Sequence, residues 1–119
     1  MNFNSILIGS EESERLAEYY GRVLGEPAFT GEGYTTWMIG SGAVTVGPHT
    51  EVKGRNTAPG RLIWNIESAD VRADFDRFQA AGATVVKAPY EFEGMPGTWI
   101  ATFSDPDDNY FQLISPVTM

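Results

Sequence analysis

The sequence predicts an α+β domain built from two copies of one strand–helix–three-strand module. The same order of elements occurs twice, and a polar, breaker-rich segment at residues 47–60 separates the copies. Each predicted helix ends at a glycine, Gly25 or Gly82, at nearly the same distance from its start. Because each helix follows one strand and precedes a meander, both helices should cover one face of their sheets. We therefore expect one domain over residues 1–119, with module one at about 1–48 and module two at about 60–116.

The first module opens with the apolar segment FNSILIGS, which is typical of a short strand. Ser10 then stands where a helix N-cap is expected, followed by glutamates that suit a first helical turn. The apolar residues of this helix recur at helical spacing: Leu16, Ala17, Tyr20 and Leu24. Three short strands are predicted within PAFTGEG, YTTWMIG and AVTVG, because glycine turns separate them.

The second module repeats this order from the segment RLIWNIE. We expect its strand to place Leu62, Trp64 and Ile66 on the side of the helix. Ser68 or Asp70 can cap that helix. The apolar face of the helix consists of Val71, Phe75, Phe78 and Ala81. Three strands, ATVVKAPY, GTWIATFS and NYFQLIS, complete the module.

Charge and composition limit the possible partners. The 119 residues carry a net charge of −8, which disfavours nucleic acid and anionic membranes, since both require a basic face. The chain contains no cysteine, so disulfides, thiolate metal sites and cysteine nucleophiles are excluded. It has no apolar run long enough for a membrane span, and we expect no signal peptide because its first residues lack a basic region and a long apolar stretch. We expect a cytoplasmic protein whose partner is a small molecule or another protein.

Three segments, in this order and spacing, resemble the vicinal oxygen chelate superfamily. They are AEYYGRVLGEP at residues 17–27, FQAAGATVV at 78–86 and FSDPDDNYFQLISP at 103–116. The superfamily includes glyoxalase I, bleomycin-resistance proteins, fosfomycin-modifying enzymes and extradiol dioxygenases. The resemblance implies two βαβββ modules whose curved mixed sheets form a cleft. In the enzymes that cleft holds a divalent metal on His, Glu or Gln side chains, and the metal acts as a Lewis acid.

The resemblance also implies where the four metal ligands would stand: at Ser5, on or near Val46, at or near Arg61, and at Gln112. Ser5 is a poor ligand, Val46 cannot coordinate, and Arg61 would repel a cation. Only Gln112 could contribute an amide oxygen. We therefore expect no divalent metal and no other cofactor, and we interpret Gln112 as a hydrogen-bonding group that lines the cleft.

Strand alternation gives further candidates for ligand binding. Ser5 should share the cleft face with Leu7, Arg61 with Asn65, and Gln112 with Tyr110. Arg61 could hold a carboxylate or phosphate, or it could form a salt bridge or be simply exposed. Trp37 and Trp99 could stack on a planar ligand, pack in the core or contact a second chain. His49 could act as a base or be a solvated loop residue.

These residues favour a metal-free binding protein over an enzyme. It would sequester a partly apolar or cationic small molecule, and it should be a homodimer because the sheet faces and edges need cover. The alternatives are a glyoxalase-like lyase, isomerase or dioxygenase with an atypical metal site, and an interaction module without a small ligand.

Overall fold

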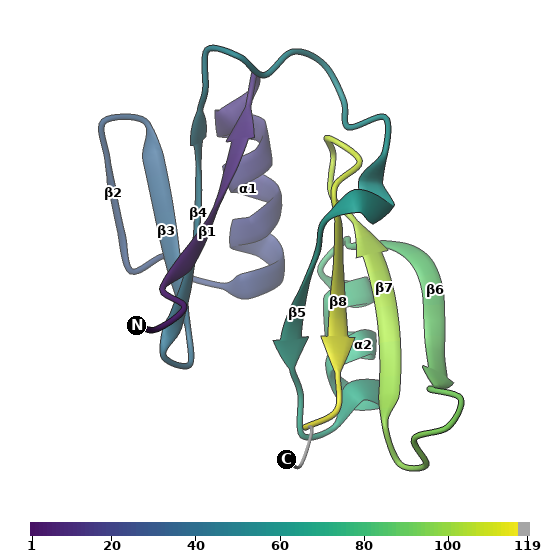
Figure 1. Ribbon diagram of the computed structural model, residues 1–119. Helices are drawn as coiled ribbons and strands as arrows, with labels where there is room; N and C mark the ends of the chain where they lie inside the picture. The colour runs from purple at the N-terminus through teal and green to yellow at the C-terminus, as the bar shows by residue number, and fades with distance from the viewer. Residues whose placement is uncertain (117–119) are drawn as a thin grey trace. The chain divides into compact units, whose positions relative to one another are not determined.

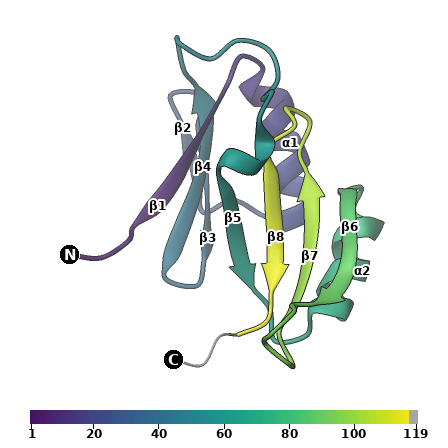
Figure 2. The same cartoon turned by 45° about the vertical axis from the view of Figure 1, so that its right-hand side comes forward.

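The computed structural model of the protein describes residues 1–116, which form two compact units (Figures 1 and 2). Unit 1 is Met1–Arg55, and unit 2 begins at Asn56. The division falls within the segment 47–60 that separates the two predicted modules. No helix among residues 1–116 is long and apolar enough to cross a membrane.

Unit 1 is a four-stranded mixed sheet with one helix. Its elements are β1 (Ser5–Ser10), α1 (Ser13–Leu24), β2 (Phe29–Gly31), β3 (Tyr34–Ile39) and β4 (Gly42–Pro48). The strand order is β1-β4-β3-β2, with β1 parallel to β4 and the other pairs antiparallel. Figure 1 shows α1 on one face of this sheet.

Unit 2 repeats the same topology. Its elements are a 3-10 turn, η1 (Pro59–Arg61), then β5 (Ile63–Glu67), α2 (Val71–Ala80), β6 (Thr84–Glu91), β7 (Trp99–Ser104) and β8 (Tyr110–Ile114). The strand order β5-β8-β7-β6 corresponds to that of unit 1, with β5 parallel to β8. Figure 2 shows α2 beside β6 and β7. The predicted α+β fold of two βαβββ modules is therefore confirmed.

The two helices begin in different ways. Of the two predicted caps of α2, Ser68 and Asp70, the N-cap is Asp70, because its side chain accepts a hydrogen bond from the Ala73 N–H. The prediction that Ser10 caps α1 was wrong, since the N-cap of α1 is Glu12 and makes no side-chain capping bond. Ser10 is buried, and its Oγ accepts instead from the Glu12 N–H at 3.0 Å. The hydroxyl thus stabilises the turn before the helix rather than its first turn.

The core of unit 1 lies between α1 and its sheet. Tyr20 is fully buried and lies 6.3 Å from Trp37, measured between ring centroids. The Trp37 Nε1–H donates to the Gly25 carbonyl at 2.9 Å, so the buried indole keeps a hydrogen-bond partner. Leu16, Val23, Val44 and Val46 also belong to this core.

The core of unit 2 is an aromatic cluster under α2. Phe103 of β7 lies between Phe75 and Phe111, with ring centroids 5.5 and 5.4 Å away. Phe78 packs against the Phe103 ring, and Trp64 stacks on Phe111. Leu62 was expected in this core, but β5 begins only at Ile63. Its side chain is 75% exposed because η1 occupies the residues before it.

The hairpin between β2 and β3 contains a strained residue. Glu32 has φ +56° and Gly33 has φ +86°, a pair of positive φ values as in type I′ turns. Asparagine tolerates this region better than glutamate. We expect Glu32→Asn to raise the free energy of unfolding by about 0.5 kcal/mol. Urea denaturation measures this, with Glu26→Asn as a control of equal charge change, and an unchanged or lower value for Glu32→Asn would contradict the expectation.

Candidate functional site

Each sheet has one face against its helix and one helix-free face. Along β1, Ile8 is buried on the helix side, whereas Leu7 is 54% exposed on the other side. Along β8, Phe111 and Leu113 are buried, and Tyr110, Gln112 and Ile114 alternate with them. Gln112 therefore lies on the helix-free face, as strand alternation predicts.

A row of polar side chains crosses the helix-free face of unit 2. Register aligns Asn65 of β5 with Gln112 of β8, and Gln112 with Thr102 of β7. The Gln112 Nε2–H donates to the Thr102 Oγ1 at 2.9 Å, so this contact orients the amide and leaves its carbonyl oxygen as an acceptor. Asn65 is exposed and Gln112 half-buried. We call Asn65, Gln112 and Thr102 the amide row.

Unit 1 carries a matching row at the equivalent strand positions. Register aligns Leu7 of β1 with Thr45 of β4, and Thr45 with Thr36 of β3. The hydroxyls of Thr36 and Thr45 are 2.8 Å apart and form a hydrogen bond. A cross-strand hydrogen bond thus joins the third and fourth strands of each module. Leu7, Phe29 and Met38 make the rest of this face apolar and exposed.

Val46 lies on the side of β4 opposite to the one expected. It is fully buried against α1, together with its register partner Ile8. The residue of β4 on the helix-free face is Thr45, one position earlier. Motif spacing gives the position of the helix-free residue of β4 only approximately. The register pair of Thr45 with Thr36, two polar side chains on neighbouring strands, identifies that residue as Thr45.

Arg61 lies in η1 and not at the start of a strand. Its side chain is exposed. Two features define this turn. Pro59 stands at its first position, and the Arg61 N–H donates to the Ala58 carbonyl. Asn65 is therefore the polar residue that β5 itself presents beside Gln112. Glu67, which the sequence reading missed, follows it on the same face at the end of β5.

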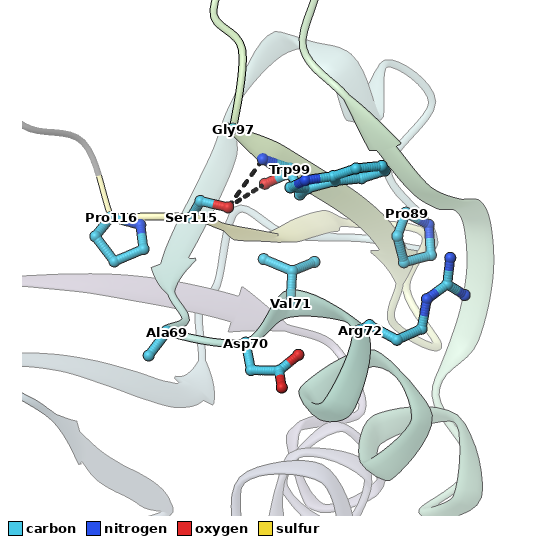
Figure 3. A pocket seen from close by; sticks show the side chains of 9 residues that line it. All are labelled: Ala69, Asp70, Val71, Arg72, Pro89, Gly97, Trp99, Ser115 and Pro116. Atoms are coloured by element: carbon cyan, nitrogen blue, oxygen red, sulfur yellow. Dashed lines mark hydrogen bonds between the residues drawn. The ribbon is translucent and has the colours of Figure 1, made fainter.

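The two tryptophans differ in their surroundings. Trp37 belongs to the core, so it provides no stacking surface on the helix-free face. Trp99 is 41% exposed and pairs with Glu91 of β6 at the start of β7. It lies on the helix side of unit 2, where Figure 3 shows its indole above Val71 of α2. Tyr110 is half-buried on the helix-free face, next to Ile63 in register.

His49 and Ser5 lie at opposite ends of unit 1. Ser5 opens β1 and is exposed. His49 is an exposed residue after β4, and its Nδ1 accepts from the Glu51 N–H at 3.2 Å. Its side chain approaches Gly9 so closely that a Cβ there would lie 2.9 Å from the His49 Cβ. The glycine therefore permits the loop to cover this end of β1.

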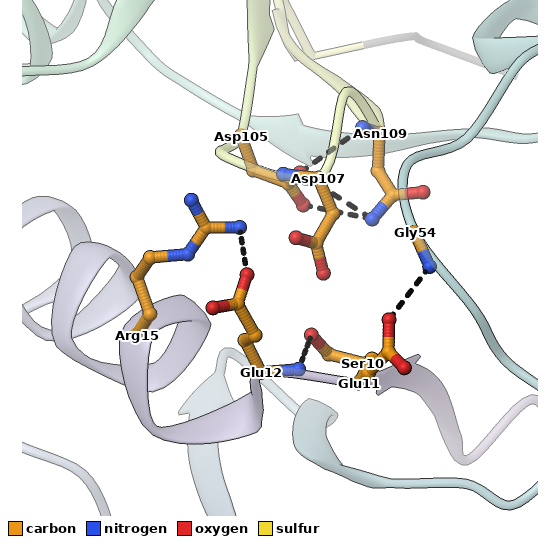
Figure 4. Close-up of polar contacts among 8 residues, drawn as sticks. All are labelled: Ser10, Glu11, Glu12, Arg15, Gly54, Asp105, Asp107 and Asn109. Carbon is orange, nitrogen blue, oxygen red and sulfur yellow. Dashed lines mark hydrogen bonds and ion pairs between the residues drawn. The ribbon is translucent and has the colours of Figure 1, made fainter.

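A buried turn fixes the start of β8 (Figure 4). Asp105 is 3% exposed, and its Oδ1 accepts from the Asp107 N–H at 2.8 Å and the Asn109 N–H at 3.0 Å. The Asn109 carboxamide also donates to this carboxylate. Asp108 adopts φ +64°, a conformation that aspartate tolerates better than most residues. The acidic turn is thus held by hydrogen bonds of its own, directly before the strand that carries Gln112.

The donor set does not fit the divalent metal of the superfamily. The helix-free strand positions offer the neutral oxygens of Ser5, Thr45, Asn65 and Gln112, and a single carboxylate, that of Glu67 at the end of β5. Such metals in protein sites prefer carboxylate and imidazole donors. Among residues 1–116, no group of three or more His, Asp or Glu side chains could hold a metal ion. A neutral amide row can instead bind a ligand by accepting and donating hydrogen bonds.

The fold and these strand positions define a two-module βαβββ protein with a polar row on a helix-free sheet face. The model of the Glyoxalase-like domain family matches residues 5–114, so the chain belongs to this family. No curated protein matches the sequence significantly.

Solved structures with the same fold have low sequence identity to this chain. A glyoxalase-related enzyme from Fulvimarina pelagi has a TM-score of 0.76 at 17% identity, covering 98% of this chain and 88% of that one. A glyoxalase/bleomycin resistance protein/dioxygenase superfamily member from Sphaerobacter thermophilus has a TM-score of 0.74 at 21% identity, covering 98% of both. TnmS3, an antibiotic binding protein from Streptomyces sp. CB03234, has a TM-score of 0.70 at 21% identity, covering 98% and 97%.

Proposed function

We propose that the protein binds a small, partly apolar or cationic molecule without a divalent metal, in the cytoplasm and as a homodimer. The observation that carries the proposal is the amide row: Gln112 stands at a position where the resemblance implies a metal ligand, and its register neighbours Asn65 and Thr102 are neutral. A binding site needs an apolar surface with a few polar anchors, and Gln112 and Asn65 provide such anchors.

The surroundings of the anchors support this function. Ile63, Tyr110 and Ile114 share the helix-free face of unit 2 with Gln112. The face carries a charge of each sign, the Glu67 carboxylate at the end of β5 and Lys87, which is aligned with Thr102 at the far end of the row. The net charge of −8 favours a cation over an anion at long range. The fold is shared with the antibiotic binding protein TnmS3, which fits a binding role.

The homodimer is proposed because of the apolar residues on the helix-free face of unit 1. Leu7 is 54%, Phe29 63% and Met38 55% exposed in the single chain. Exposed apolar groups that gather on one face commonly mark an interface. A second copy of the chain would cover them. Light scattering on the purified protein should therefore give twice the mass of one chain, and the mass of a single chain would contradict the homodimer.

Titration with a planar cation tests ligand binding. We expect proflavine to shift the side-chain amide NMR signals of Asn65 and Gln112, which Asn65→Asp and Gln112→Glu assign, and not that of Gln79 on α2. Gln112→Leu should weaken binding about fivefold because one hydrogen bond is lost. Gln79→Leu, a matched exposed substitution, should leave the affinity unchanged. Signals that do not move, or equal effects of both substitutions, would contradict a site on the amide row.

The purified protein can also be tested for binding of a divalent metal. After incubation with Mn²⁺, Ni²⁺, Zn²⁺ or Fe²⁺ and dialysis, we expect no stoichiometric metal, no rise in melting temperature, and the same proflavine affinity with and without EDTA. A stoichiometric metal that raises the melting temperature would overturn the metal-free proposal. It would favour a glyoxalase-like lyase, isomerase or dioxygenase with an atypical metal site.

A further inference from the structure

Unit 2 contains a pocket on its helix side, away from the amide row (Figure 3). The pocket has a volume of about 380 Å³, which is within the range of small-molecule sites. It lies where the first turn of α2 faces the start of β7, and all of its lining residues belong to unit 2. Its lining includes Trp99, Val71, Pro89 and Arg72.

One wall of the pocket is the indole of Trp99, whose backbone is anchored to the neighbouring strand. The backbone N–H of Trp99 donates to the Ser115 Oγ at 2.8 Å, which ties the start of β7 to the end of β8. Figure 3 shows the indole ring extending over the pocket, with Val71 below it and Pro89 beside it. Because Trp99 is 41% exposed, its ring presents a surface on which a planar ligand can stack.

The two charged residues of the lining stand on different sides of Val71. Asp70 is already engaged as the helix cap, since its Oδ1 accepts from the Ala73 N–H at 3.0 Å. Figure 3 places its carboxylate on the side of Val71 away from the indole, whereas the guanidinium of Arg72 lies near Pro89. Within residues 1–116, the ion pair of α2 joins Arg77 to Asp74, and none involves Arg72. The charge next to the stacking surface is therefore positive.

We propose that this pocket binds a small planar aromatic carboxylate, with its ring on the Trp99 indole and its carboxylate on the Arg72 guanidinium. A planar guanidinium matches a carboxylate with two parallel hydrogen bonds. The protein carries a net charge of −8, so a general attraction for anions does not account for such a preference. This site is separate from the proposed one on the amide row and requires the opposite ligand charge.

Three naphthalene probes of similar shape test the proposal: 2-naphthoate, neutral 2-naphthylmethanol and cationic 2-naphthylmethylammonium. The chain has three tryptophans, so NMR separates their indole N–H signals, and Trp99→Phe assigns that of Trp99. We expect 2-naphthoate to shift the Trp99 signal and to bind about tenfold more tightly than the alcohol. The buried Trp37 serves as an internal control whose signal should not move.

Substitution of the arginine separates the ionic contact from stacking. Arg72→Met should weaken 2-naphthoate about tenfold and leave 2-naphthylmethanol within about twofold, because only the ionic contact is lost. Arg72→Lys should retain part of the preference for the carboxylate. Arg77→Met, on the same helix but in the pair with Asp74, should change neither affinity. Thermal unfolding of each variant shows that it is folded.

Any of three results would overturn the proposal. The Trp99 signal does not shift on addition of 2-naphthoate, 2-naphthoate binds no more tightly than 2-naphthylmethanol, or 2-naphthylmethylammonium binds most tightly of the three. The failure of the amide-row proposal looks different, because it concerns proflavine and the amide signals of Asn65 and Gln112. Either site can therefore be contradicted while the other is supported.

Discussion

Phe103→Ala is expected to lower the free energy of unfolding by about 3–5 kcal/mol, the typical cost of removing a buried phenylalanine ring. The side chain is fully buried, and its ring lies between those of Phe75 and Phe111 while Phe78 packs on it at a tilt. Alanine would leave a cavity that three rigid rings cannot fill. Domains of this size have a total stability of about 5–15 kcal/mol, so the loss is a large fraction of the total and would leave a domain at the low end of that range close to unfolded.

Urea denaturation monitored by circular dichroism measures the loss. Phe92→Ala is the matched control, since the same ring is removed where the side chain is 43% exposed in the β6–β7 loop. We expect that control to change the stability by less than about 1 kcal/mol. If both substitutions cost the same, the aromatic cluster does not hold α2 on its sheet.

The order of the elements could be predicted because the apolar periodicity and the turn residues agree along the chain. Strand alternation was enough to place Leu7 and Gln112 on the helix-free faces and Ile8 and Phe111 on the helix faces. In these strands a buried side and a polar or exposed side differ in chemistry, so the sequence identifies the face directly. The fold was therefore accessible without a structure.

Errors arose where a face depends on pairing or on where an element starts. Val46 was assigned from motif spacing, but its alignment with Thr35 and Ile8 places it in the core. Arg61 and Leu62 were read as strand residues, although the Pro-Gly pair before them forms a 3-10 turn. Residues after a proline can form a turn or extend into the next strand, and the sequence around Pro59 is compatible with both structures.

The sheet faces on which the two tryptophans lie could be assigned only from the registers of their hairpins. Trp37 is aligned with Val44 of the core, whereas Trp99 is aligned with Glu91 at the start of its hairpin. Register shifts occur in the β6–β7 pair between Val85 and Lys87 and between Lys87 and Tyr90. Because each irregularity can exchange the faces of a strand, alternation counted from the sequence fails in this hairpin. The pocket beside Trp99 was accordingly not foreseen.

Asp105→Ala is expected to lower the free energy of unfolding by about 2–4 kcal/mol, although no apolar packing is removed. The substitution takes the acceptor away from the N–H groups of Asp107 and Asn109. Buried donors that lose a charged acceptor carry a desolvation cost of about 1–3 kcal/mol. Asp105→Asn should cost less, because an amide oxygen can still accept from both N–H groups. Asp76→Ala, an exposed position on α2, should have an effect within about 0.5 kcal/mol.

The same substitution connects the turn to the proposed binding face. Gln112 lies in the strand that this turn begins, and its amide is held by Thr102 of the neighbouring strand. If the turn positions the amide row, Asp105→Ala should speed hydrogen exchange along β8 and weaken proflavine binding, while Asp76→Ala should do neither. Loss of stability with unchanged exchange in β8 and unchanged affinity would mean that the acidic turn stabilises unit 2 without setting the position of Gln112.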